Sequence, residues 1–248
     1  VFPLSERLVG KNYPPMHPWC RSTTISIIDE ETLARMKKRA YNPGTGRIEL
    51  IPANMTYDQW YEKYVKGNAK AEAQEKAIKN SSSDREQYER YQKVLGKTVP
   101  KSFADFQDMK YNEPEMWKFM KLDYQRRNEL LQHPELKLPN AENAILPEPK
   151  FMKYLFDENS EKGYPKGRAF TDRLGYGIDN WQKLQKALKE GTTQYPATFK
   201  GNEGFGDRYE QKMILYGLKD TPANVIVAWI KKADGTTKLT STYIKEAK

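Results

Sequence analysis

The chain has 248 residues, which is enough for one or two domains. Hydrophobic residues make up 38% of it and aromatic residues 12%, so we expect modest folded cores rather than a disordered chain. The formal net charge of +9 favours contact with nucleic acid or another acidic surface, although a solvated lysine-rich surface has the same balance. A single cysteine excludes an intrachain disulfide, and no apolar run approaches the roughly 20 residues of a membrane-spanning helix.

Residues 10–22 combine three prolines with a dense run of His, Trp, Cys and Arg, and a β-branched segment follows at 23–28. Each proline fixes φ and disfavours helix in the residue before it. The pattern therefore predicts an extended segment that leads into a strand at 23–28. The residues that define this structural motif are Asn12, Pro14, Pro15, His17, Pro18, Cys20 and Arg21.

This motif resembles the closing motif of phage minor head proteins of the Mu F type, the head-morphogenesis family. The resemblance implies that residues 1–55 are the end of a head-morphogenesis domain and that the chain, which begins at Val1, is the C-terminal portion of a longer protein. It further implies synthesis in the bacterial cytoplasm, a place in the phage head of the virion, and portal and capsid proteins as partners.

His17 and Cys20 permit two sharper interpretations. His-x-x-Cys is half of a zinc site, but the chain has one Cys and two His, so four ligands of these types cannot be assembled. A Cys/His catalytic pair is the alternative to a purely structural role. We expect no metal site and no cofactor.

Asp29 is expected to cap a short helix that runs to Arg39, and a turn at 42–46 ends it. Thr56 and Gln59 form a capping box that opens a helix through Val65. The Ala-, Lys- and Ser-rich stretch 67–83 is expected to be an exposed helix that frays into a linker.

The middle region, residues 56–137, continues as short amphipathic helices. A capping box at Ser83 and Glu86 opens one that ends at Gly96, Ser102 opens the next, and Pro114 and Pro134 bound the last. The aromatic residues of these helices could stack on bases, but their helical spacing favours a protein core.

Residues 138–248 change from helices to strands. After a linker at 138–141, helices are expected over 150–156 and from Asp179, with Trp181, Leu184 and Leu188 on one stripe. Strands follow at 208–218, 224–231 and 236–244, with a hairpin turn at Asp234-Gly235. The glycine-rich stretch 199–207 is read as a connector or a mobile lid. The fold class is therefore α+β: a helical N-terminal and middle region, then a small domain with helices packed on a three- to four-stranded antiparallel sheet.

This last domain resembles an uncharacterised C-terminal domain of phage minor head proteins and bacterial polymorphic toxins. The resemblance implies an effector domain that a cognate immunity protein would restrain. The matching pieces are Leu138-Pro139-Asn140-Ala141, Lys153-Tyr154-Leu155, Lys166-Gly167-Arg168-Ala169-Phe170, Leu174-Gly175-Tyr176, Trp181-x-x-Leu184 and Leu239-Thr240-Ser241-Thr242-Tyr243.

Several residues of this domain suit the cleavage of RNA by its own 2′-hydroxyl. Lys166 and Arg168, expected on a glycine-flanked turn, would neutralise phosphate charge, and Ser241 and Tyr243 would supply hydroxyls. No histidine follows His133, which excludes a histidine acid/base pair here. Arg173 and Lys212 are the further candidates for nucleic-acid binding. Alternatively, Lys166 and Arg168 are surface charges and Tyr243 belongs to the core.

Three functions follow. The first is a phage minor head protein that takes part in head morphogenesis and in DNA packaging or delivery and carries an effector domain. The second is a metal-independent ribonuclease-type toxin domain acting on RNA. The third is a non-catalytic nucleic-acid-binding module.

Overall fold

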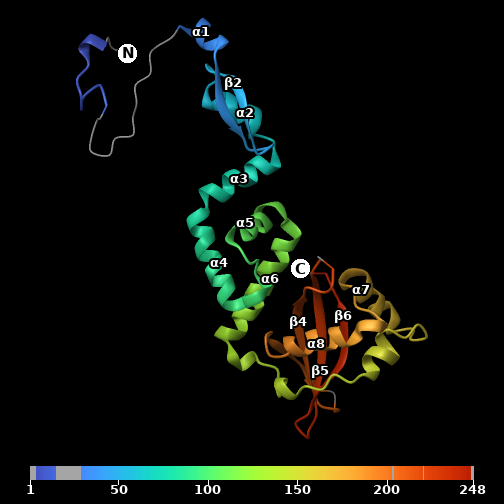
Figure 1. Ribbon diagram of the computed structural model, residues 1–248. Coiled ribbons are helices and arrows are strands. Elements are labelled where there is room, and N and C mark those ends of the chain that lie inside the picture. The colour runs from blue at the N-terminus through green and yellow to red at the C-terminus, as the bar shows by residue number, and fades with distance from the viewer. Residues whose placement is uncertain (1–3, 15–28, 203, 220, 247–248) are drawn as a thin grey trace. The chain divides into compact units, whose positions relative to one another are not determined.

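The computed structural model describes residues 4–14, 29–202, 204–219 and 221–246 (Figure 1). Its contacts divide the chain into two compact units, Val1–Glu72 and Ala73–Lys248. Of the N-terminal motif, Asn12 and Pro14 are described, whereas Pro15 to Arg21 and the strand expected at 23–28 lie outside the described residues. The domain boundaries expected at residues 56 and 138 stay predictions.

The first unit contains a β-hairpin that the sequence did not reveal. Asp29 caps α1 (Glu30–Arg35) as expected, with its Oδ1 accepting from the Thr32 N–H at 2.8 Å. The helix then ends four residues before Arg39, because Lys37–Asn42 (β1) pairs antiparallel with Arg47–Pro52 (β2). The expected turn at 42–46 therefore joins two strands.

The remaining elements of the first unit begin with a confirmed capping box. Thr56 and Gln59 exchange hydrogen bonds at the start of α2 (Tyr57–Tyr64), and the helix ends at Val65. Before the motif, η1 (Leu4–Glu6) is followed by a turn in which Asn12 accepts from the Leu8 N–H at 2.6 Å.

The expected frayed linker is absent from the described chain between residues 67 and 83. Instead α3 (Ala69–Lys79) and α4 (Ser81–Leu95) follow one another, with Asn80 alone between them. The Ser83–Glu86 capping box is also wrong, since α4 begins at Ser81 and Ser83 lies inside it, donating to the Asn80 carbonyl at 3.0 Å. The helix starts earlier because Asp84, in its first turn, accepts hydrogen bonds from three side chains of the helix Phe103–Asn112.

The helices α4, α5 (Phe103–Asn112) and α6 (Pro114–Gln132) enclose an aromatic core, as their spacing predicted. The rings of Tyr91 and Tyr124 stack with centroids 4.2 Å apart. The predicted helix signals are also confirmed: Gly96 ends α4 at φ +57°, Ser102 caps α5, and Pro114 opens α6. The other elements nearby are η2 (Gly96–Thr98) and η3 (Pro134–Leu136).

The α+β fold class is confirmed by a four-stranded antiparallel sheet in the order β3-β4-β5-β6. Its strands are β3 (Ala197–Asn202), β4 (Asp207–Leu215), β5 (Ala223–Lys231) and β6 (Thr237–Ile244). The sequence missed β3, because its glycine-rich end was read as a loop, whereas Ala197 pairs with Gln211 and Gly201 lies at a bulge. Strand β4 ends before the expected Leu218, since the chain turns there and the Leu218 N–H donates to the Leu174 carbonyl at 2.7 Å.

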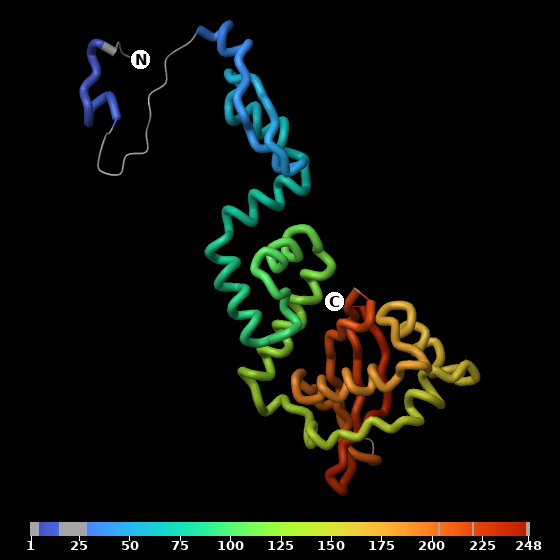
Figure 2. The backbone as a smooth tube through the Cα atoms, in the orientation of Figure 1, coloured from blue at the N-terminus to red at the C-terminus, as the bar shows by residue number. Residues whose placement is uncertain are grey.

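Helical segments cover one face of this sheet and pack on its edge (Figures 1 and 2). They are η4 (Ala141–Asn143), the π-helical turn η5 (Phe151–Leu155), α7 (Tyr164–Leu174), η6 (Ile178–Asn180) and α8 (Trp181–Gly191). Trp181, Leu184 and Leu188 of α8 point into the core as predicted. The segment 138–141, expected to introduce a linker, is irregular but packs into the same core, with Leu138 1% exposed and Ala141 fully buried.

Within the described part of the chain, none of the helices has the length and apolar character needed to span a bilayer.

Candidate active site

Lys166 of α7 lies at the centre of a polar cluster beside the edge strand β6. Its Nζ donates to the Tyr154 hydroxyl at 3.1 Å and to Ser241 Oγ at 3.2 Å. The same Nζ is 5.4 Å from the ring centroid of Tyr154 and 5.8 Å from that of Tyr243. The structure thus brings together three residues named from the sequence, Lys166, Ser241 and Tyr243, and adds Tyr154. We call these four residues the Lys166 cluster.

A glycine allows α7 to approach η5 closely enough to build this cluster. A Cβ at position 167 would lie 1.7 Å from the Leu155 carbonyl oxygen, so no other residue fits there without a shift of the backbone. Residues 166–168 lie inside α7, so the glycine-flanked turn expected there is wrong. Gly167 serves helix packing, which places Lys166 next to Tyr154.

The hydroxyls of Ser241 and Tyr243 come from alternate positions of β6, so both side chains stand on the same face of that strand. Ser241 is opposite Ala228 and Tyr243 is opposite Ile226. Thr242, between them, points the other way, and its hydroxyl is buried and donates to the Ile226 carbonyl at 3.0 Å.

A second cation lies against the same tyrosine. The Nζ of Lys150 is 5.5 Å from the Tyr154 ring centroid. Among the described residues, no carboxylate lies within 4.0 Å of Lys150 or Lys166. Rings and hydroxyls position these half-buried ammonium groups, and their positive charge remains available to an anion.

Tyr154 and Lys150 were not among the residues chosen from the sequence. Tyr154 is half-buried and packs against the main core, and its hydroxyl accepts from Lys166. A residue twelve positions before Lys166 has no spacing rule that signals this contact, so only the packing of η5 against α7 reveals it.

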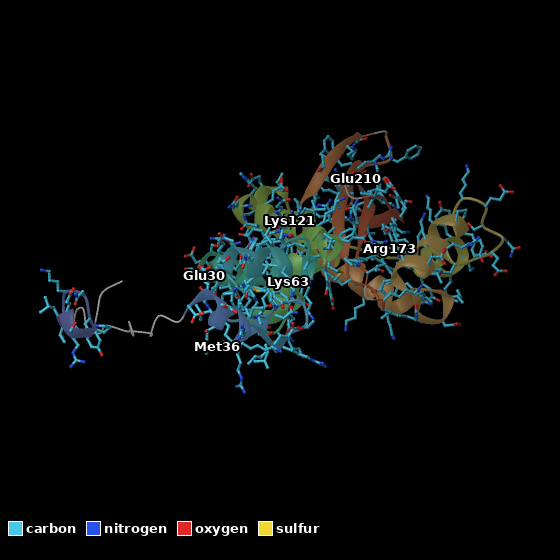
Figure 3. The ribbon with its side chains drawn as sticks, turned by 90° about the horizontal axis from the view of Figure 1, so that it is seen from above. Glu30, Met36, Lys63, Lys121, Arg173 and Glu210 are labelled. Carbon is cyan, nitrogen blue, oxygen red and sulfur yellow. The ribbon has the colours of Figure 1, made fainter. Side chains whose placement is uncertain are left out.

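Arg168, Arg173 and Lys212 lie apart from the Lys166 cluster. Arg168 is exposed on α7, about 200° around the helix from Lys166. Arg173, labelled in Figure 3, lies near the end of α7 and donates to the Pro222 carbonyl at 3.2 Å and to Glu115 of α6 at 2.8 Å. Lys212 is exposed in the middle of β4. Their expected roles in binding nucleic acid stay predictions.

The carboxylates of this domain are dispersed: Asp172 lies on α7, and Asp207 and Glu210 lie on opposite faces of β4. In the described ranges, no three His, Cys, Asp or Glu side chains gather closely enough to hold a metal ion.

Comparison with known proteins gives a match over the same part of the chain. Residues 137–246 match a family described as "Domain of unknown function (DUF6883)". No curated protein matches the sequence. Among solved structures, the chain is similar to one described as "Contact-dependent growth inhibition toxin - immunity protein complex from Klebsiella pneumoniae 342". The two are 13% identical, the match covers 41% of this chain and 99% of the other, and the TM-score of 0.34 is too low to assign a shared fold.

Proposed function

We propose that residues 137–246 form a ribonuclease-type toxin domain that cleaves RNA without a metal ion, with the Lys166 cluster as its active site. One observation carries this proposal: Lys166 converges with the hydroxyls of Tyr154 and Ser241 and the ring of Tyr243, and no carboxylate of the described residues pairs with it. A positioned cation beside several hydroxyls is what the charged phosphorane of RNA transesterification requires.

In the proposed reaction the 2′-hydroxyl oxygen attacks the adjacent phosphorus, and the bond from phosphorus to the 5′-oxygen breaks. The Lys166 ammonium stabilises the negative charge on the non-bridging oxygens. The 2′-hydroxyl loses its proton and the 5′-oxygen gains one through the hydroxyls of Ser241 and Tyr243. Each of these hydroxyls accepts one proton as it gives up another, so both are unchanged at the end of the reaction. The products are a 2′,3′-cyclic phosphate and a 5′-hydroxyl.

The test is expression of the whole 248-residue chain in bacteria, together with incubation of the purified protein with single-stranded RNA in EDTA. We expect growth arrest and RNA fragments that end in a 2′,3′-cyclic phosphate. Lys166→Ala should slow cleavage about 100- to 1,000-fold, the usual cost of removing one donor that stabilises a developing charge. The matched control is Lys183→Ala, which removes the same charge from an exposed position on α8.

Equal cleavage by wild type and Lys166→Ala, with both variants folded by circular dichroism, would disprove the proposed active site. RNA binding without cleavage would favour the non-catalytic nucleic-acid-binding module. Neither binding nor cleavage would reject both RNA functions.

We also propose that this domain travels on a phage minor head protein, with portal and capsid proteins as partners and an immunity protein restraining it in the producing cell. The support is the resemblance of residues 12–21 to the closing motif of head-morphogenesis proteins. The test is mass spectrometry of purified particles from a lysogen that encodes the chain. Particles that lack its peptides while containing portal protein would reject the virion location.

A further inference from the structure

Helix α6 lies against the sheet through a buried cluster of charged and polar groups. Asp123 is fully buried, and its Oδ1 accepts from Arg127 Nε at 2.7 Å and from the Tyr195 hydroxyl at 2.6 Å. The Tyr195 hydroxyl in turn accepts from Arg127 Nη2 at 3.1 Å. Burial and the charge of Asp123 raise the pKa of Tyr195, so its hydroxyl keeps the proton that it donates. We call Asp123, Arg127 and Tyr195 the Asp123 cluster.

Further contacts extend this interface in both directions from the Asp123 cluster. Arg126, which directly precedes Arg127 on α6, donates to the Asn224 amide oxygen of β5 at 2.7 Å, and Asn224 is 4% exposed. At the other end of the helix, Glu115 pairs with Arg173 of α7 at 2.8 Å, where Glu115 remains 66% exposed.

The sheet itself is built to be covered on this side. Met213 and Leu215 of β4 point into the main core, so Ile214 between them points to the opposite face. Ile214 is nevertheless 1% exposed, and α6 contacts β4 at this level. Without α6, an isoleucine, the Tyr195 phenol and the Asn224 amide would lose their cover or their partners, and each loss costs free energy.

We infer that this sheet face is a helix-docking surface whose occupant is α6, and that the residues from Ala73 to Gln132 remain bound to the C-terminal domain without a covalent connection. The recognition chemistry is a helix that presents Asp, Arg and Arg at positions i, i+3 and i+4 to a tyrosine hydroxyl and an amide. The folding unit therefore crosses the family boundary at residue 137. This inference does not depend on the proposed RNA cleavage.

The experiment inserts a specific protease site into the whole chain between His133 and Pro134, in the exposed segment that follows α6. After complete cleavage, the two pieces are analysed by size-exclusion chromatography with mass spectrometry. We expect them to elute together as a one-to-one complex. Separate elution of the two pieces, whether or not the C-terminal piece stays folded, would overturn the inference.

Two variants of the cut protein locate the binding energy. Asp123→Asn keeps the shape of the side chain but removes its charge, and we expect it to weaken the complex about 100-fold, as truncation of a buried charge pair does. Glu115→Gln breaks only the exposed ion pair and should change the affinity less than about threefold. Equal affinities for the two variants would contradict the assignment of the Asp123 cluster as the anchor.

Discussion

The Asp123 cluster and the Lys166 cluster both join helices to the sheet, but their charged groups differ in whether they have a partner of opposite charge. In the first, the carboxylate is fully buried and Arg127, with a side chain 15% exposed, is bonded to it. In the second, two ammonium groups are held by tyrosine rings and hydroxyls, and no described carboxylate pairs with them. Because its charges are paired, the first cluster serves to hold α6 on the sheet, whereas the unpaired cations of the second remain able to bind an anion.

A second buried carboxylate shows that burial alone does not set the behaviour of an acid. Asp84 of α4 has no exposed surface, like Asp123. Its Oδ1 accepts from Lys110 at 2.6 Å, and its Oδ2 accepts from Gln107 and Tyr111, each at 2.9 Å. Asp123 Oδ2, by contrast, has no partner within hydrogen-bond distance among the described residues.

The pKa values of the two acids consequently move in opposite directions. Burial opposes the ionisation of both. For Asp84 the three donors outweigh burial and lower the pKa below its ordinary value of 3.8. For Asp123 burial outweighs the charge of Arg127 and the hydrogen bonds from Tyr195 and Arg127, and it raises the pKa. The balance between burial and the surrounding donors and charges decides the direction of each pKa shift.

Asp123→Ala tests the structural role of the Asp123 cluster and has the largest expected effect on stability. It leaves Arg127, which is largely buried between α6 and the sheet, charged and without a carboxylate partner, so the free energy of unfolding should fall by about 3–5 kcal/mol. Urea denaturation followed by tryptophan fluorescence measures this change. A loss of unfolding free energy below about 1 kcal/mol would mean that the Asp123 cluster does not hold α6 on the sheet.

Asp84→Ala tests the carboxylate of the helical middle region, and we expect a loss of about 2–3 kcal/mol. Three donors lose their acceptor, but Lys110, with a side chain 21% exposed, can turn to water. The same urea denaturation series compares it directly with Asp123→Ala. A larger loss than for Asp123→Ala would reverse the ranking of the two sites.

The pH dependence of the Asp84 contribution follows from the direction of its pKa shift. Because the folded pKa lies below 3.8, the carboxylate stabilises the fold above this value, and the contribution is lost as the pH falls through the folded pKa. The stability difference between wild type and Asp84→Asn should therefore be constant at neutral pH and shrink below about pH 4. A difference that grows on acidification would contradict the lowered pKa.

Lys166→Met has the smallest expected effect on stability, although we propose that it abolishes activity. It breaks no ion pair, and a methionine keeps the apolar stem against the tyrosine rings, so the free energy of unfolding should change by less than about 1 kcal/mol. Thermal melts of the variant and of wild type measure the change. A loss of stability comparable to that of Asp123→Ala would mean that the Lys166 cluster has a structural role as well.

Local signals in the sequence predicted many element boundaries. The Thr56–Gln59 box, the Ser102 cap, Pro114 and the Asp234-Gly235 turn each act through neighbours within four residues, which a sequence displays directly. Misleading local patterns produced the errors at 36–42, at Ser83 and at 199–202. In each case strand pairing or packing against another element overrode the local preference, as in the ladder of β1 with β2.

The sequence by itself determined the α+β class and the aromatic core of the middle helices, because composition and periodicity carry that information. Lys166, Ser241 and Tyr243 were named instead from the resemblance of the last domain and the chemistry of their side chains, and their role stays a prediction. The tertiary structure alone decided that Tyr154 joins Lys166, that Arg168 points elsewhere, and that Asp123 meets Tyr195. These contacts join residues separated by 12 to 72 positions, and no local rule of spacing or propensity relates such residues. Their geometry exists only once the sheet has placed α6, α7 and η5 around it.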